Sequence, residues 1–300
     1  MQPLFFRSAD AMTEPSARRA FVSCLSPAGL HRMAYTEYGA PDNPQVLVCV
    51  HGLTRVGRDF HRLALALADR YRVVCPDVVG RGASDWLRDP QYYALPQYVA
   101  DMVTLIARLN VETVHWVGTS MGGLIGISLA GQPGTPIRKL VINDVGPRVD
   151  PQGVARIASY VGSAPRFASF EEALQYIKRV TATFALRTEG QWREITESVL
   201  RRDGDGYVLH YDPRLALPIK AMTPEIAAAS EAALWRLYDR IECPTLLIRG
   251  ADSDLLSRET AREMTERGPR AKLVEFAGVG HAPMLMDEEQ IAAVRDFLLA

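Results

Sequence analysis

The sequence contains no apolar run long enough to cross a membrane, because none of its hydrophobic stretches approaches the roughly 20 residues that a transmembrane helix needs. It also carries almost no excess charge, since 34 Lys and Arg residues are balanced by 35 Asp and Glu residues. This balance argues against a broad basic surface for nucleic acid or anionic lipid. Residues 1–19 lack the apolar core of a signal peptide. We therefore expect a soluble cytoplasmic protein with no nucleic-acid or membrane partner, and the sequence leaves its oligomeric state open.

Cysteine is scarce, with four residues in the chain, and no two of them form a C-x-x-C pair. Cys24, Cys49, Cys75 and Cys243 are spread along the sequence, and most lie in or beside apolar runs. No pair of histidines has the spacing of metal ligands. We therefore expect buried free thiols in a reducing compartment and no metal site.

The glycine motifs that bind nucleotide cofactors are incomplete. Gly80-Arg81-Gly82 begins like a dinucleotide fingerprint, but Asp85 stands where the third glycine belongs. A P-loop lysine is also missing. The run from Asp77 to Ser84 is therefore interpreted as a structural turn, and no cofactor is expected.

Along most of the chain, short apolar segments alternate with segments of helical periodicity. Val46–Val50 is a continuous apolar run, typical of a parallel strand that is covered on both faces. Strand and helix patterns alternate from there to Asn143, and the alternation resumes from Pro244 to Leu299. This order predicts an α/β fold with a doubly wound, mostly parallel sheet.

The alternation stops between Arg148 and Arg240, where helical patterns occur without a strong strand. Such an insertion between two sheet strands is typical of a lid. The predicted organisation is an N-terminal arm (1–20), a core made of residues 21–147 and 241–300, and an inserted all-helical cap (148–240). A chain of 300 residues suits one α/β domain with an insertion.

The most informative stretch is Val114–Ala130. A short apolar strand leads into Gly118, Ser120 and Gly122, which fill the pattern Gly-x-Ser-x-Gly, and an apolar helix follows. A strand, a sharp turn and a helix, with serine at the tip, form the context of a nucleophile elbow. Glycines are needed there because a Cβ two residues before or after the serine would crowd the turn.

Further reactive side chains follow the carboxyl ends of the other predicted strands, where ligands bind in open α/β sheets. These residues are His51 and Gly52, Asp144, Asp252 and Asp254, and His281. With Ser120 they give the chain order serine, acid, histidine. This is the order of the catalytic triad in α/β hydrolases.

On these motifs the sequence resembles the α/β-hydrolase fold superfamily, in particular its serine esterase-like branch with a helical lid. The resemblance covers about residues 21–299 apart from the lid, and rests on His51-Gly52, Gly118-Thr119-Ser120-Met121-Gly122 and Gly280-His281-x-Pro283. Haloalkane dehalogenases and epoxide hydrolases of this fold carry aspartate at the position of Ser120, so those two activities are not expected.

The resemblance implies a role for each residue. Ser120 is the expected nucleophile, and His281 is the base that takes its proton and later protonates the leaving alcohol. Asp254 is the preferred acid, with Asp144 and Asp252 as alternatives. The backbone N–H groups of Met121 and Leu53 are expected to form the oxyanion hole, and His51 and Gly52 to support it.

The predicted activity is hydrolysis of a carboxylic ester through an acyl-enzyme, on a small or medium hydrophobic ester or a lactone. A carbon–carbon bond hydrolase of the meta-cleavage-product type is an alternative, although the loop after Gly52 lacks the expected glycine- and proline-rich pattern. A small-molecule receptor with slow turnover is the alternative outside enzymology.

Overall fold

The computed structural model describes residues 17–300. Most of the predicted N-terminal arm, residues 1–16, lies outside these described residues. For residues 18–20 the prediction of an arm is wrong, because a strand already begins at Arg18. That strand pairs along its whole length with its neighbour, and Arg18 lies opposite Glu37, to which it is also ion-paired.

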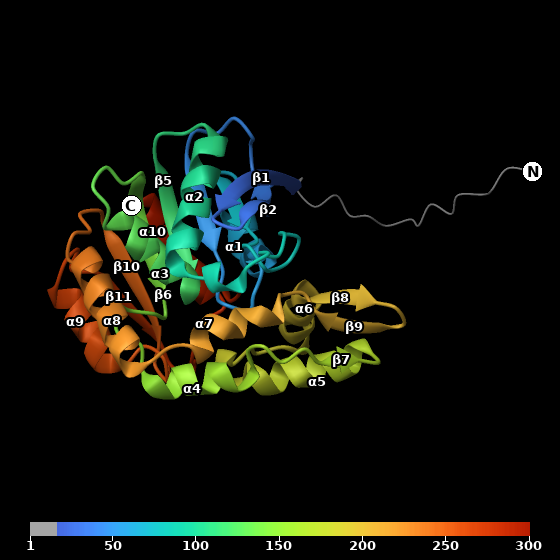
Figure 1. The fold of residues 1–300 in the computed structure, drawn as a ribbon. Helices are drawn as coiled ribbons and strands as arrows, with labels where there is room; N and C mark the ends of the chain where they lie inside the picture. Colours follow the sequence, from blue (N-terminus) through green and yellow to red (C-terminus); the bar gives the residue numbers. More distant parts are fainter. Residues whose placement is uncertain (1–16) are drawn as a thin grey trace, which may run out of the picture.

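A twisted eight-stranded sheet forms the centre of the core (Figure 1). Its strands lie in the order β1-β2-β4-β3-β5-β6-β10-β11. The pairs β1–β2 and β2–β4 are antiparallel, and all other pairs are parallel, as the alternating sequence pattern predicted. The strands are β1 (Arg18–Ser26), β2 (Gly29–Tyr38), β3 (Val46–Val50), β4 (Arg72–Pro76), β5 (Val114–Thr119), β6 (Ile137–Asn143), β10 (Thr245–Gly250) and β11 (Lys272–Phe276).

Helices cover both faces of this sheet. On one face α2, α3, α8 and α9 pack over the sheet, and on the other face α1 and α10 do so. The bounds are α1 (His61–Leu67), α2 (Leu95–Leu109), α3 (Met121–Ala130), α8 (Pro224–Tyr238), α9 (Arg258–Glu266) and α10 (Glu288–Leu299), with the 3₁₀ helices η1 (Gly57–Phe60) and η2 (Pro90–Tyr92). In the described part of the chain no helix has the length and apolar character needed to cross a bilayer.

The residues between β6 and β10 form a cap below the carboxyl ends of the strands, drawn from green to orange in Figure 1. Its elements before α8 are α4 (Pro151–Tyr160), β7 (Arg166–Phe167), α5 (Phe170–Val180), η3 (Ala182–Phe184), α6 (Glu189–Val199), β8 (Leu200–Asp203), β9 (Gly206–Leu209), η4 (Pro213–Leu215) and α7 (Ala216–Lys220). The last helix of the insertion, α8, returns to the core and packs on α3.

The prediction of an all-helical cap is wrong, because the cap contains a three-stranded antiparallel sheet in the order β7-β9-β8. Residues 203–206 form a turn that joins β8 to β9. Gly204 takes a positive φ of 58° there, which suits a tight hairpin. These strands span two to four residues, too few to give a clear alternating pattern.

The turn at Ser120 depends on very close backbone packing. Ser120 has φ 53° and ψ −116°, an unfavourable conformation for a residue with a side chain. A Cβ at Gly118 would lie 2.1 Å from the carbonyl oxygen of Gly122, and a Cβ at Gly122 would lie 1.9 Å from that of Val50. Both glycines are therefore required, as predicted, because each contacts backbone that cannot move aside.

We predict that Gly122→Ala lowers the free energy of unfolding by about 2–3 kcal/mol, because overpacking of a rigid core outweighs the helix propensity that alanine adds. Thermal or urea unfolding of the purified protein measures this loss. Gly190→Ala in α6 is the matched control, since a Cβ there meets only Thr188 Oγ1 at 3.8 Å. The control should be neutral or stabilise by up to about 1 kcal/mol. Equal stability of the two variants would contradict the role given to Gly122.

Candidate active site

Three side chains that follow the ends of β5, β6 and β11 form a hydrogen-bonded chain. The Oγ of Ser120 lies 3.0 Å from Nε2 of His281, and Nδ1 of His281 lies 2.8 Å from Oδ2 of Asp144. Asp144 and His281 are both buried. Because an ionised carboxylate only accepts hydrogen bonds, Nδ1 carries the proton and Nε2 is free to accept the proton of Ser120.

The carboxylate of Asp144 is held by more than the histidine. Its Oδ1 accepts a hydrogen bond from the N–H of Gly250 at 2.9 Å, and its Oδ2 accepts another from the hydroxyl of Ser253 at 2.7 Å. Asp144 also has a positive φ of 58°, and its own N–H donates to Ile248. These contacts fix the carboxylate, and through it the orientation of the imidazole ring.

The prediction that Asp254 is the acid beside His281 is wrong, because Asp144 is the carboxylate that contacts the ring. The carboxylate of Asp254 accepts two hydrogen bonds from Arg156 in the cap, at 2.5 and 2.8 Å, which hold its pKa below the ordinary value. Asp252, the third candidate, is exposed. The loop after β10 does lie beside the loop of His281, but β6 is the direct neighbour of β5, so Asp144 reaches the space next to Ser120.

The loop after β3 lies beside Ser120, where the oxyanion hole was expected. Nδ1 of His51 donates to the carbonyl oxygen of Gly52 at 2.7 Å, and Nε2 accepts from the N–H of Val78 at 2.9 Å. Burial lowers the pKa of His51 to about 3, so the ring stays neutral and bridges two loops. Gly52 approaches the Ser120 side chain, and Leu53 lines the same pocket. Met121 begins α3, where the first N–H groups have no partner within the helix.

Arg81 is a functional candidate that the sequence did not single out, since its glycine-flanked position was read only as a turn. Its side chain is completely buried and donates to the carbonyl oxygen of Leu53 at 2.8 Å, while Nη2 lies 3.4 Å from Sδ of Met121. Within residues 17–300 no acidic side chain forms an ion pair with it. Arg81 thus contacts both residues whose N–H groups were expected to bind the oxyanion.

The turn that contains Arg81 has the structural role that was predicted. The carboxylate of Asp77 accepts hydrogen bonds from the N–H groups of Gly57 and Ala83, at 2.8 and 2.9 Å. A Cβ at Gly82 would lie 2.3 Å from that carboxylate. The run from Asp77 to Ser84 therefore folds around an internal acid and does not form a phosphate loop.

Asn143 is a second functional candidate that no sequence motif indicates. Its amide nitrogen donates to the carbonyl oxygen of Pro283 at 2.7 Å and to Oγ1 of Thr119 at 3.0 Å. It therefore ties the loop of His281 to the residue before Ser120. A buried amide at the end of a central strand is the one signal that could have indicated this role.

The cap closes the pocket in which Ser120 and His281 lie. Core residues form one side of the pocket, and the cap contributes Arg156, Ile157, Tyr160, Thr181 and Phe184. Oγ1 of Thr183 donates to the carbonyl oxygen of His281 at 2.6 Å, so the cap also contacts the loop of the histidine. The cavity volume is about 50 Å³, room for a few water molecules.

Comparison with known proteins agrees with this architecture. Residues 47–294 match the alpha/beta hydrolase family. The chain belongs to this family. It is 57% identical over 286 residues to a protein of Cupriavidus necator named 3-hydroxybutyrate-oligomer hydrolase, covering 94% of this chain and 98% of that one.

Solved structures of other hydrolases share the whole fold. An alpha/beta hydrolase from Novosphingobium aromaticivorans superposes with a TM-score of 0.83 at 34% identity, covering 94% of this chain and 98% of the other. A hydrolase from Rickettsia typhi gives a TM-score of 0.84 at 28% identity, covering 95% and 99%. The fold class and family expected from the sequence motifs are therefore confirmed, and the chain is a hydrolase.

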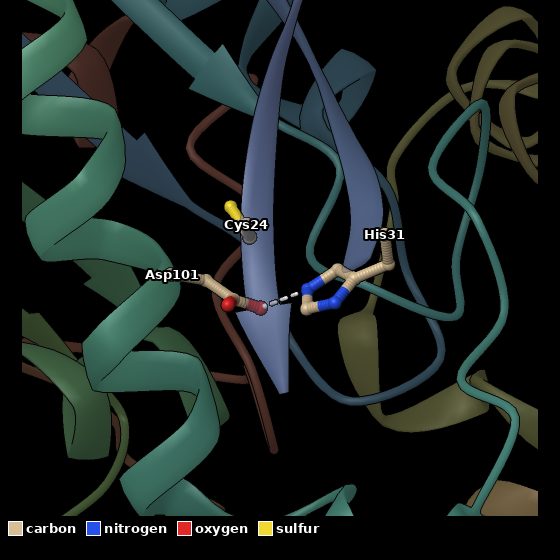
Figure 2. A group of neighbouring side chains, drawn as sticks. All are labelled: Cys24, His31 and Asp101. Atoms are coloured by element: carbon tan, nitrogen blue, oxygen red, sulfur yellow. Dashed lines mark hydrogen bonds and ion pairs between the residues drawn. The ribbon is translucent and has the colours of Figure 1, made fainter. Parts of the chain in front are cut away.

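Outside the hydrolase site, one group of side chains in residues 17–300 could offer ligands to a metal ion. Cys24 of β1, His31 of β2 and Asp101 of α2 bring one ligand atom each to within 4.8 Å of one another (Figure 2). Nε2 of His31 already lies 3.0 Å from Asp101, and burial raises the pKa of the Cys24 thiol to about 12. Since His31 and Asp101 already bind each other, we interpret the group as a buried polar contact between the hairpin and α2. Asp101 lies 70 residues from His31 in the sequence, so spacing could not have indicated the whole group.

We predict that His51 makes the hydrolase less stable as the pH falls below neutral. Between pH 6.5 and about 3 the unfolded chain binds a proton at this ring and the folded chain does not, so stability rises with pH in this window. In His51→Gln the slope of unfolding free energy against pH should decrease by up to about 1.4 kcal/mol per pH unit. Urea unfolding of both proteins at several pH values measures the slopes. Identical slopes would contradict a buried neutral His51.

Proposed function

We propose that this hydrolase cleaves the ester bonds of 3-hydroxybutyrate oligomers through an acyl-enzyme on Ser120. The observation that carries the ester chemistry is the chain of hydrogen bonds from Ser120 through His281 to Asp144, inside a capped pocket. The substrate class is proposed from the Cupriavidus necator relative, because 57% identity extends over nearly all of both chains. The apolar side chains of Leu53, Ile157 and Met284 in the pocket suit the methyl and methylene groups of such oligomers.

In the first half of the reaction, Oγ of Ser120 attacks the ester carbonyl carbon while Nε2 of His281 takes its proton. Asp144, which is the acid in this proposal, stabilises the resulting imidazolium. The carbonyl oxygen becomes an oxyanion, which accepts hydrogen bonds from the N–H groups of Leu53 and Met121. Arg81 donates a hydrogen bond to the carbonyl oxygen of Leu53. This contact holds the loop, and with it the N–H of Leu53, in place during the step.

In the second half, the tetrahedral intermediate collapses and the C–O bond breaks. His281 gives its proton to the departing alcohol oxygen, which leaves as a free hydroxyl group. A water molecule then attacks the acyl-enzyme while Nε2 of His281 takes its proton. Collapse of the second intermediate releases the carboxylic acid and returns the proton to Ser120.

We predict that the purified protein releases 3-hydroxybutyrate from the dimer and trimer, and that Ser120→Ala abolishes this release. Loss of the nucleophile should lower kcat by roughly 10⁴-fold or more, because histidine and acid cannot act without it. Chromatography of the products measures the release, and thermal unfolding verifies that the variant is folded. A wild-type protein that cleaves p-nitrophenyl butyrate but neither oligomer would overturn the proposed substrate and leave the ester chemistry intact.

We predict that Asp144→Asn and Asp254→Asn differ strongly in their effect on p-nitrophenyl butyrate hydrolysis. The first should lower kcat by roughly 10⁴-fold, because asparagine can favour the wrong tautomer of His281 and cannot stabilise its cation. The second should cause a much smaller loss, since the contact of Asp254 is with Arg156. Steady-state kinetics of the two isosteric variants compares them directly. The opposite ranking would return the role of the acid to Asp254.

A further inference from the structure

Besides the reacting groups, the pocket of Ser120 is lined by a cationic side chain from the cap, Arg156 of α4. Its guanidinium contacts Asp254 through Nε and Nη2, at 2.5 and 2.8 Å. Both side chains are about one quarter exposed, at 27% and 25%. Since this ion pair is at the edge of the pocket, it is accessible to a ligand there.

A guanidinium has two edges that can each bind a carboxylate, one made of Nε and Nη2 and one made of Nη1 and Nη2. Asp254 occupies the first edge of Arg156, so the second edge remains on the other side of the group. Tyr160, one helical turn further along α4, lines the same pocket, and its hydroxyl contacts Arg156. The two side chains thus supply several donors that an anion could accept from.

The position of Arg156 is set by loops that belong to the reacting groups. The N–H of Asp252 donates to the carbonyl oxygen of Val279 at 2.9 Å, so the loop of Asp254 is joined to the loop of His281. The N–H of Gly153 in α4 donates to the carbonyl oxygen of Asp254 at 3.0 Å. Arg156 is therefore on the histidine side of the pocket. His281 protonates the leaving alcohol, so this is also the side on which the leaving fragment departs.

The chemistry of the proposed substrate supplies an anion at this side. In a 3-hydroxybutyrate dimer the leaving fragment carries the free carboxylate, four bonds away from the carbonyl carbon that Ser120 attacks. Four bonds of about 1.5 Å each reach about 5 Å, so the carboxylate of the leaving fragment stays close to the reacting groups. Apart from this terminal charge the oligomer is neutral, so a single cationic side chain on the histidine side of the pocket matches it.

We propose that Arg156, assisted by Tyr160, binds the terminal carboxylate of the leaving fragment, and that Asp254 positions Arg156 for this contact. The proposal rests on the proposed substrate class. It makes the enzyme select oligomers with a free acid end, cleaved one unit from that end, over neutral esters of the same size.

Arg55 also lines the pocket but does not suit this role. Its Nε and Nη2 contact Asp59 at 2.7 Å each, and Nη2 also donates to the carbonyl oxygen of Ile195 at 3.0 Å. Its side chain is 8% exposed, against 27% for Arg156. Arg55 therefore joins the loop after β3 to α6 of the cap, and its removal would disturb the closed cap itself.

The experiment compares kcat/KM for the 3-hydroxybutyrate dimer as free acid and as methyl ester, in wild type and in Arg156→Gln. Wild type should prefer the free acid, and the variant should lose roughly 10- to 100-fold of that preference, because a charge-assisted contact is removed. Arg193→Gln is the matched control, since Arg193 is a cap arginine that pairs with Glu171 and does not line the pocket. The control should keep the wild-type preference.

A second readout does not depend on oligomer turnover. 3-Hydroxybutyrate should inhibit hydrolysis of p-nitrophenyl butyrate by wild type more strongly than its methyl ester does, and Arg156→Gln should remove that difference. If wild type cleaves the dimer but the acid preference and the inhibition are the same in Arg156→Gln, the carboxylate site is overturned while the proposed function stands. If wild type cleaves neither dimer but shows the Arg156-dependent inhibition, the proposed substrate is wrong and the carboxylate site is retained.

Discussion

The active site depends on one close approach, that of the first turn of α3 to the end of β3. The Cα of Gly122 lies so near the carbonyl oxygen of Val50 that no side chain fits between them. This contact brings the N-terminus of α3 next to the loop of His51 and Gly52, and so brings Ser120 next to Leu53. A larger residue at Gly122 would push α3 away from the end of β3, and so would move Ser120 relative to Leu53.

Around this contact, buried hydrogen bonds from several strand ends hold the side chains and loops of the candidate active site. Asp144 binds the backbone of Gly250 and the hydroxyl of Ser253, so the ends of β6 and β10 are joined at the acid. Asn143 joins the loop of His281 to the end of β5. The fully buried side chain of Arg81 donates a hydrogen bond to the carbonyl oxygen of Leu53. Such preorganised donors need no rearrangement when charge develops on a substrate.

The sequence predicted the parts of this protein that follow from local patterns. The parallel sheet, the turn at Ser120 and the loops of His51 and His281 have short motifs, because each needs particular residues at fixed spacing. The partner of His281 has no such motif. Asp144 and Asp254 both follow sheet strands, and the choice depends on strand order and on Arg156, more than 90 residues from Asp254 in the chain. The short cap strands and the buried Arg81 likewise depend on tertiary contacts that spacing does not encode.

The cap contacts the core at the pocket itself. The position of the cap therefore affects the loops that carry the candidate reacting groups. Arg55 donates from the loop beside Ser120 to Ile195 of the cap, and Thr183 of the cap donates to the backbone of His281. Arg156 of the cap contacts Asp254 on the core. Any movement of the cap away from the core would therefore break contacts to the loops on both sides of Ser120. While the cap is closed, these contacts also hold the two loops in place, so closure of the cap is coupled to the positions of the candidate reacting groups.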